Sequence, residues 1–236
     1  MKFIAHRGAC LEETEDTLRA LLRAAEYGAY AVECDPRYTK DGILVLFHDD
    51  DLLRLAGDPA RVSDLTYAAL SEKLASAGVD LTTFEDVYTG YTGASAVLFD
   101  LSFHAEDPAF FEWLKNAPFR AIAGVHAPDE AVLASRYLPK EDILAFMPDP
   151  SMAEAFHDAG CGILRLWETW LEKVTPADIR ARVGETEVWI MACDASIHHP
   201  LHSMNGSVSS IERAKALGAD GILLNDILLA SQYPLS

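Results

Sequence analysis

Short apolar runs alternate with amphipathic stretches along most of the chain. The runs predict β-strands buried on both faces of a parallel sheet, because they are nearly continuous in apolar residues. They cover residues 2–6, 29–35, 43–49, 95–101, 119–125, 142–147, 162–167, 187–192 and 220–225. The stretches between most of them repeat apolar residues every three or four positions, which predicts helices with one buried face. These stretches are residues 16–29, 107–116, 128–138, 149–160 and 207–219.

The alternation amounts to about eight strand–helix units. Residues 30–48 hold two strand runs separated by the turn sequence TKDG, so this unit carries a short extra strand after the second barrel strand. Eight units in 236 residues predict an α/β fold, a TIM-like (β/α)₈ barrel that forms a single domain over residues 1–236. An open doubly wound sheet is the alternative, but no GxGxxG motif follows the first strand.

Composition narrows the possible partners. The chain has 19 basic and 37 acidic residues, a formal net charge of −18, which disfavours nucleic acids and anionic membrane surfaces. It has no run of 18 apolar residues, and its N-terminus MKFIAHRG is not typical of a secretory signal. The four cysteines are widely spaced, as in reduced proteins. We therefore expect a cytoplasmic protein that acts on small molecules.

Carboxylates follow two of the predicted barrel strands. In such barrels the working residues lie at the C-terminal ends of the strands. Glu33 and Asp35 are two residues apart on one strand, so both side chains point to the same face, and Asp100 ends the next barrel strand. Oxygen-only ligation suits Mg²⁺ or Ca²⁺, so these three residues are candidate ligands of a divalent cation. The alternative is that the acids lie at exposed strand ends and pair with Lys or Arg.

Two histidines and an arginine complete the candidate chemistry. His6 and His48 both follow apolar strand residues, and imidazole is suited to acid–base catalysis near neutral pH. A structural role, with a ring nitrogen bonded to a backbone carbonyl, is the alternative for either histidine. Arg7 can clamp a phosphate through two N–H groups, or it can form a salt bridge to Glu33.

The order of these residues resembles a known family. The chain reads HRG at residues 6–8, EDT at 15–17 and GAYAVECDPRYTKDGILVLFHDD at 28–50. This resembles the glycerophosphodiester phosphodiesterase family, whose members usually show HRG, ENT, G-A-x-x-x-E-x-D, T-K-D-G and V-x-x-H-D. A weaker resemblance continues at residues 61–70, 83–90, 188–194 and 218–226.

The resemblance implies a TIM-like barrel with a divalent cation. Such an enzyme hydrolyses a small-molecule glycerophosphodiester to sn-glycerol 3-phosphate and an alcohol. His6 and His48 match the family's general acid–base pair, Glu33 and Asp35 match metal ligands, and Arg7 matches the arginine that contacts the phosphate. The resemblance does not assign which histidine is the acid.

The chain departs from the family at the third ligand. The family usually has an E-x-K motif there, and this sequence has Asp100-Leu101-Ser102. Asp100 keeps a carboxylate with a shorter reach, whereas Ser102 removes a cation expected to contact the phosphate. This change motivates an alternative function, a weakened or inactive barrel that binds a phosphorylated polyol. Arg165, at the end of the sixth strand, is a candidate to replace the lost charge, with a surface salt bridge as its alternative.

Two smaller departures and two further features complete the sequence-based expectations. Asp16 replaces the middle residue of the ENT motif, and Asn225 stands where the family has Asp. Trp189, on the seventh strand, is a candidate to pack against the glycerol of the substrate, and its alternative role is to fill the core. The HHxxH sequence at residues 198–202 is interpreted as part of a polar lid in preference to a transition-metal site.

Overall fold

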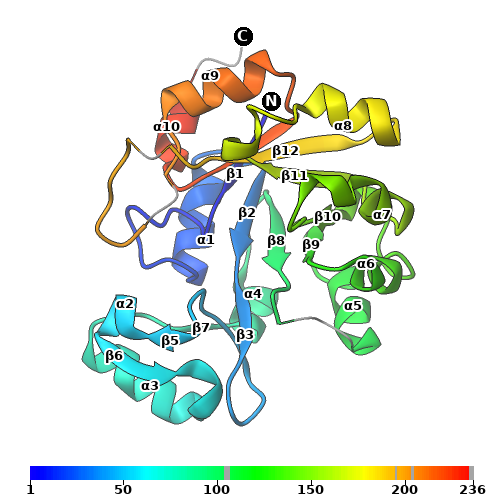
Figure 1. The fold of residues 1–236 in the computed structure, drawn as a ribbon. Coiled ribbons are helices and arrows are strands. Elements are labelled where there is room, and N and C mark those ends of the chain that lie inside the picture. Colours follow the sequence, from blue (N-terminus) through cyan, green and yellow to red (C-terminus); the bar gives the residue numbers. More distant parts are fainter. Residues whose placement is uncertain (104–106, 195, 203–204, 234–236) are drawn as a thin grey trace.

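Eight parallel strands close into a barrel in the computed structural model, which describes residues 1–103, 107–194, 196–202 and 205–233 (Figure 1). Every neighbouring pair is parallel, and β1 pairs with β13 to close the sheet. The strands, in their order around the barrel, are β1 (Lys2–Ala5), β2 (Ala31–Cys34), β8 (Ala96–Asp100), β9 (Ala121–Val125), β10 (Ile143–Ala145), β11 (Ile163–Trp167), β12 (Glu187–Met191) and β13 (Gly221–Leu224).

A helix follows each barrel strand before the next one begins. This arrangement confirms the (β/α)₈ barrel predicted from the sequence. Three short 3₁₀ turns, η2 (Lys140–Asp142), η3 (Pro150–Met152) and η4 (Glu168–Trp170), lie between these elements. The helices are α1 (Leu18–Glu26), α4 (Phe84–Gly90), α5 (Pro108–Lys115), α6 (Pro128–Ala134), α7 (Ala153–Asp158), α8 (Pro176–Val183), α9 (Val208–Ala216) and α10 (Ile227–Gln232).

Local sequence explains where several helices begin. Thr17 caps α1 by accepting a hydrogen bond from the Ala20 amide, and Asp107 caps α5, whose first residue is Pro108. These side chains satisfy amide groups that have no partner inside the helix. Proline suits the first turn because its missing N–H would have no intrahelical partner there.

The chain leaves the barrel between β2 and α4. The apolar run predicted as an extra strand contains β4, which pairs with β3 and β7 in a small antiparallel sheet outside the barrel. This excursion is larger than the single strand expected from the sequence, and it has its own apolar cluster around Val62, Leu70 and Leu74. Figure 1 shows it in colours from blue to blue-green, set to one side of the barrel. Its elements are β3 (Pro36–Tyr38), β4 (Leu44–Leu46), β5 (Asp51–Leu52), α2 (Leu53–Ala56), β6 (Asp58–Arg61), η1 (Val62–Asp64), α3 (Tyr67–Ser76) and β7 (Thr82–Thr83).

Two apolar layers support the barrel. One fills its interior with alternate residues of the strands, among them Ile4, Leu98, Ile163 and Leu223. The other lies between the strands and the surrounding helices, where residues of opposite parity such as Val97 pack. Such packed interiors leave only the C-terminal mouth of a small barrel open to ligands.

The described residues include no helix that is both long and apolar enough to cross a membrane. The four cysteines are free thiols, and three of them are buried.

Candidate active site

A cavity of about 530 Å³ opens at the C-terminal mouth of the barrel. We call it the barrel lobe. Seven of the eight residues proposed from the sequence line it, namely His6, Arg7, Glu33, Asp35, His48, Asp100 and Arg165. The remaining lining residues are Arg37, Asp49, Asp50, Ser102, His126, Phe146, Trp167, Met191 and Leu223.

A tight turn after β1 directs Arg7 into this cavity. Arg7 has a φ of +56°, in the left-handed region that non-glycine residues seldom adopt, and Gly8 follows with a φ of +73°. A Cβ atom on residue 8 would lie 2.6 Å from the backbone carbon of Ala20, so glycine is required there. The turn lets the Arg7 amide donate a 2.8 Å hydrogen bond to Oε2 of Glu33. The strain is therefore stored next to the candidate ligands.

Three carboxylates crowd together at the bottom of the barrel lobe. Ligand oxygens of Glu33, Asp35 and Asp100 all lie within 4.8 Å of one another, and no other group of this kind exists among the described residues. Burial, followed by the charges of Asp35, Asp16 and Asp100, raises the pKa of Glu33 well above its ordinary value. Burial also raises the pKa of Asp35. The fold thus holds like charges together at a cost that a cation would relieve.

Asp16 fixes the position of Asp35 by accepting a hydrogen bond from its backbone amide. It has a φ of +57°, and its Oδ1 accepts a 3.0 Å hydrogen bond from the Asp35 amide. Short polar residues such as Asp and Asn tolerate this left-handed conformation, which suits the exchange of the family's Asn for Asp16. The other carboxylate oxygen of Asp16 and Oδ2 of Asp35 are both buried without a hydrogen-bond partner among the described residues.

The three carboxylates fit a hard divalent cation. All donors are oxygens, and the buried Oδ2 of Asp35 has no hydrogen bond that a cation would displace. Mg²⁺ and Ca²⁺ prefer such ligands, whereas Zn²⁺ is usually held by His or Cys. His126 contacts one member of the group, since its Nε2 lies 2.6 Å from Oδ1 of Asp100.

The two candidate catalytic histidines have different surroundings. His6 Nδ1 donates to Oδ1 of Asn225 at 2.6 Å, and the Asn225 amide in turn donates to Asn205, which fixes its orientation. The other ring nitrogen of His6 is free to face the cavity, 4.0 Å from Oε2 of Glu33. Burial, and then the nearby Arg7, lower the pKa of His6 well below its ordinary value.

His48 lies at the edge of the cavity and is more exposed. Its Nδ1 donates to Oδ1 of Asp49 at 2.7 Å, so Nε2 is the nitrogen available to a ligand. The second oxygen of Asp49 accepts from Nε of Arg54 at 2.6 Å. These hydrogen bonds outweigh partial burial and lower the pKa of Asp49, which keeps a negative charge beside His48 at neutral pH.

Arg165 is a buried cation without a carboxylate partner in the described structure. Its Nε and Nη1 atoms have no hydrogen-bond partner among the described residues, although the side chain is almost fully buried. The guanidinium stands 4.1 Å from the centre of the Trp167 ring and 5.2 Å from that of Phe146. Burial lowers its pKa to about 10, so it stays charged at neutral pH. An anion in the barrel lobe would supply the missing hydrogen bonds.

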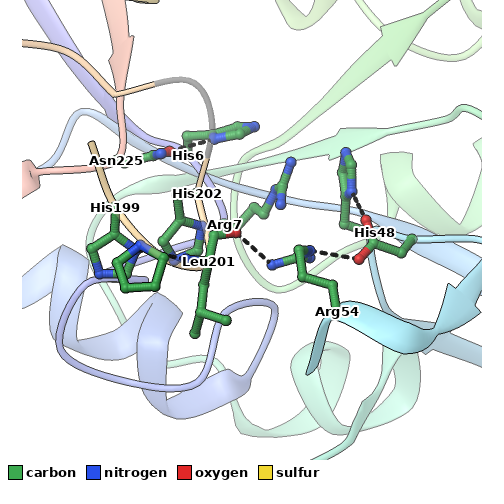
Figure 2. A pocket seen from close by; sticks show the side chains of 10 residues that line it. His6, Arg7, His48, Arg54, His199, Leu201, His202 and Asn225 are labelled. Atoms are coloured by element: carbon green, nitrogen blue, oxygen red, sulfur yellow. Dashed lines mark hydrogen bonds and ion pairs between the residues drawn. The ribbon is translucent and has the colours of Figure 1, made fainter. Parts of the chain in front are cut away.

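A smaller cavity of about 290 Å³ adjoins the barrel lobe. We call it the side lobe; Figure 2 shows the residues around it. The side lobe shares four lining residues with the barrel lobe, namely His6, Arg7, His48 and Asp49. Its remaining walls are Arg54, His199, Pro200, Leu201, His202 and Asn225.

The structure differs from the sequence-based expectation at Trp189. This residue is fully buried inside the barrel, and its indole N–H donates to Glu187 at 2.9 Å, toward the N-terminal end of β12. It lines neither lobe and packs edge-on against Tyr30. Room for the indole comes from Gly221 on the neighbouring strand, where a Cβ would lie 2.9 Å from Trp189 Cδ1. Trp189 therefore fills the core, the alternative role weighed for it.

Other residues at the mouth carried little signal in the sequence. Arg54 binds Glu15, Asp49 and the Leu201 carbonyl, which come from three distant segments, so no spacing along the chain reveals it. Phe146 follows an ordinary apolar strand. In the HHxxH segment, His202 is buried beside Glu15 and Cys10, and the three-carboxylate group is separate from it.

A TIM barrel with a buried acidic group and two histidines at its mouth defines a class of candidate hydrolases, and comparison with known proteins identifies the family. The model of the glycerophosphoryl diester phosphodiesterase family matches residues 6–123, which is half of the chain. The chain therefore belongs to this family, as its motifs suggested.

Individual relatives match over shorter stretches. The human glycerophosphodiester phosphodiesterase 1 is 45% identical over 64 residues, which are 27% of this chain and 19% of that protein. A protein of Mycobacterium tuberculosis named as a probable glycerophosphodiester phosphodiesterase 1 is 46% identical over 69 residues, 29% of this chain and 25% of that protein. The matched stretches thus span a quarter or less of these relatives.

Solved structures agree over nearly the whole chain. A glycerophosphodiester phosphodiesterase from Thermotoga maritima has a TM-score of 0.70 at 19% identity and covers 97% of this chain and 96% of its own. A phosphodiesterase from Oleispira antarctica, solved with the product sn-glycerol 3-phosphate, has a TM-score of 0.70 at 20% identity and covers 98% and 96%. At these identities the likeness establishes the fold.

Proposed function

We propose that this protein hydrolyses glycerophosphodiesters to sn-glycerol 3-phosphate and an alcohol with the help of a divalent cation. One observation carries the proposal: the three crowded carboxylates, the two histidines and the unpaired Arg165 all line one cavity. Membership of the family and the Oleispira antarctica relative with bound sn-glycerol 3-phosphate support the substrate class.

Glu33, Asp35 and Asp100 would hold the cation, which we take to be Mg²⁺ or Ca²⁺. When bound, it supplies positive charge to the phosphate oxygens as negative charge builds up on them. The protein's own part is to present three oxygen donors without competing hydrogen bonds at Oδ2 of Asp35. The Arg7 amide holds Glu33 in place for this role.

His6 and His48 would carry the proton transfers. One imidazole accepts a proton from the nucleophile, which is water or the 2-hydroxyl of the substrate's own glycerol. The new P–O bond forms while the P–O bond to the alcohol breaks, and the other imidazole donates its proton to the leaving oxygen. Asn225 and Asp49 position the two rings by fixing one nitrogen of each. With the 2-hydroxyl as nucleophile, water then opens the cyclic phosphate.

Two arginines would bind the phosphate. Arg7 is held by Glu15 at 3.1 Å and faces Oδ2 of Asp35 at 3.5 Å, which leaves its Nε without a hydrogen bond among the described residues. Arg165 approaches from the far side of the barrel lobe. Preorganised cations of this kind stabilise developing charge without reorganising during the reaction. Arg165 thereby takes over the charge that the family's lysine would provide at Ser102.

Ser102 motivates a second candidate function, a barrel that binds a phosphorylated polyol without turning it over. Ser102 lines the barrel lobe where the family has a lysine. If the barrel had lost activity through this change, Ser102→Lys would raise activity from near zero. If Arg165 already supplies the charge, wild-type protein is active and Ser102→Lys changes kcat/KM little.

The test is release of sn-glycerol 3-phosphate from glycerophosphoglycerol, glycerophosphoinositol, glycerophosphocholine and glycerophosphoethanolamine. Each reaction is run with Mg²⁺, with Ca²⁺ and with EDTA, beside a His6→Asn variant of matched thermal stability. We expect release that both EDTA and His6→Asn abolish. No release from any substrate with either metal would refute the proposed reaction and favour the binding function.

A further inference from the structure

The side lobe adjoins the candidate active site, and apart from Asn225 its remaining lining residues have no role in the proposed reaction. Four lining residues are common to the two lobes, among them both candidate catalytic histidines. A phosphodiester has two arms, so a phosphate held beside His6 and His48 extends one arm into each lobe. The barrel lobe holds the carboxylates and Arg165, which leaves the side lobe for the second arm.

Among the residues that the structure describes, Asp49 is the only carboxylate that lines the side lobe, and it is already paired. Both oxygens of Asp49 are engaged, Oδ1 by His48 at 2.7 Å and Oδ2 by Arg54 at 2.6 Å (Figure 2). Behind this wall, Glu15 is buried and also has both oxygens engaged, by Arg7, Arg54 and His202. Thus none of the described residues around the side lobe offers a free carboxylate, although the chain as a whole carries a net charge of −18.

The side lobe also lacks the other group that recognises an ammonium ion. Proteins bind quaternary ammonium ligands on the faces of Trp, Tyr or Phe, and none of the residues that line this lobe in the described part of the chain is of these types. The barrel lobe has Trp167 and Phe146, but the Arg165 guanidinium already stands over both rings. A second cation on those rings would be repelled by the first.

Hydrogen-bonding groups and apolar edges line the lobe instead. The His199 Nδ1 accepts a hydrogen bond from the Leu201 amide at 3.2 Å, so in the neutral ring Nε2 carries the proton and can donate. His48 likewise has Nε2 available. Pro200 and Leu201 are exposed and form the apolar part of the wall. Such a surface fits a chain of carbons that carries hydroxyl groups.

We infer that the side lobe receives the alcohol head group of the substrate and selects an uncharged polyol, such as glycerol or inositol, over choline or ethanolamine. This inference rests on the proposed function, because it deepens the same site. The departing arm differs among glycerophosphodiesters, while the glycerol phosphate arm is common to all of them. A comparison of head groups therefore isolates the side lobe.

The experiment measures kcat/KM for glycerophosphoglycerol and for glycerophosphocholine under the same metal conditions. For the wild-type protein we expect a preference of about tenfold or more for glycerophosphoglycerol, as one unfavourable charge contact would give. Leu201→Glu, at an exposed position of the wall, should reduce that preference by about tenfold, because it gives the side lobe a free carboxylate that can pair with the choline ammonium group. Leu201→Gln has the same shape without the charge and should leave the ratio near the wild-type value.

A remote control separates local from global charge. Val132→Glu adds the same charge on the exposed face of α6, away from both lobes, and should leave the ratio unchanged. The inference is overturned if the wild type prefers glycerophosphocholine or does not discriminate. It is also overturned if Leu201→Glu and Leu201→Gln shift the ratio equally. Release from neither substrate would instead refute the proposed reaction, a different result from a wrong ratio.

Discussion

The two ends of the barrel treat polar groups in opposite ways. At the N-terminal end, Lys2 pairs with Glu187 at 2.6 Å and stands over the Tyr30 ring at 4.3 Å. Glu187 also accepts from the indole of Trp189, and Arg120 binds the Tyr30 hydroxyl. Each of these polar groups has a partner of suitable chemistry, although most of them are only half-buried or exposed.

The mouth leaves more deeply buried polar groups without partners. Five buried side-chain atoms among the described residues lack a hydrogen bond, and all belong to Arg7, Asp16, Asp35 and Arg165. Like charges crowd there as well, since three carboxylates approach within 4.8 Å. Buried unpaired polar groups normally cost stability, so the contrast suggests that the mouth is arranged for a ligand that completes it.

The sharpest way to break this contrast is to remove one of the crowded carboxylates. We expect Glu33→Gln to lower kcat/KM by about 10³-fold, because the variant holds the divalent cation more weakly and the phosphate loses that preorganised positive charge. Thermal stability in EDTA should be equal or higher than in the wild type, because the variant relieves repulsion among buried acids. Initial rates and a melting curve check both parts. A marked loss of stability with little loss of activity would place Glu33 among the structural residues.

The opposite result is expected at the base of the barrel. Trp189→Leu should reduce the free energy of unfolding by about 3 kcal/mol, because it opens a cavity and removes the indole hydrogen bond to Glu187. The folded fraction should keep kcat/KM within about threefold of wild type, since Trp189 lines neither lobe. Urea unfolding and steady-state kinetics at a temperature where both proteins are folded make the comparison. A raised KM in fully folded Trp189→Leu would show that Trp189 contributes to substrate binding.

Substitution of Arg165 should change activity and stability in opposite directions. Arg165→Met should lower kcat/KM by about 10²-fold and raise stability by about 1 kcal/mol, because it removes a buried cation whose Nε and Nη1 have no hydrogen-bond partner among the described residues. Arg165→Lys serves as the matched control, since it keeps the charge and should retain more activity than the methionine variant. Unchanged kcat/KM together with a large loss of stability in Arg165→Met would contradict a role in phosphate binding.

Arg54 provides the smallest and most specific test. It pairs with Glu15 and Asp49, so this part of the mouth has its charges matched like those at the N-terminal end of the barrel. The hydrogen bonds of Arg54 outweigh burial and lower the pKa of Glu15, and at Asp49 the hydrogen bonds of His48 and then Arg54 do the same. A lowered carboxyl pKa in the folded state contributes stability above the ordinary value near 4, and this contribution is lost as the pH falls. We expect Arg54→Met to cost about 2 kcal/mol at pH 7.

The same reasoning gives the pH dependence. The difference in unfolding free energy between wild type and Arg54→Met should shrink as the pH falls from 5 toward 3, because the unfolded chain takes up protons on both carboxyl groups while the wild-type fold still holds them ionised. Urea midpoints at intervals across this range measure it, with Lys73→Met as an exposed ion-pair control. A difference that stays constant with pH would show that Arg54 acts through packing alone.

The barrel was predictable because its signal is local. Each barrel strand is a short apolar run followed by a helical stretch, and the motif residues His6, Glu33 and Asp35 lie at strand ends that the fold must bring together. The size of the excursion between β2 and α4 was not predicted. Its strands are two to four residues long, too short for a periodic pattern to separate them from loop.

The direction of a side chain inside the barrel was also beyond the sequence. Arg165 and Trp189 are partners in the register of β11 and β12, and both occupy the inner face. The Arg165 guanidinium extends toward the mouth, where it packs against the rings of Trp167 and Phe146. The Trp189 indole extends toward the base, where Gly221 leaves room for it. These neighbours come from other strands, so only the assembled barrel distinguishes the two residues.

The most direct test of the account is a titration of the protein with Mn²⁺, followed by the electron paramagnetic resonance signal of the free ion. Mn²⁺ accepts the same oxygen ligands as Mg²⁺. We expect one tightly held ion per wild-type chain and binding at least about tenfold weaker in Glu33→Gln. No uptake by the wild type, or equal uptake by the variant, would contradict the claim that the crowded carboxylates at the mouth form a metal site.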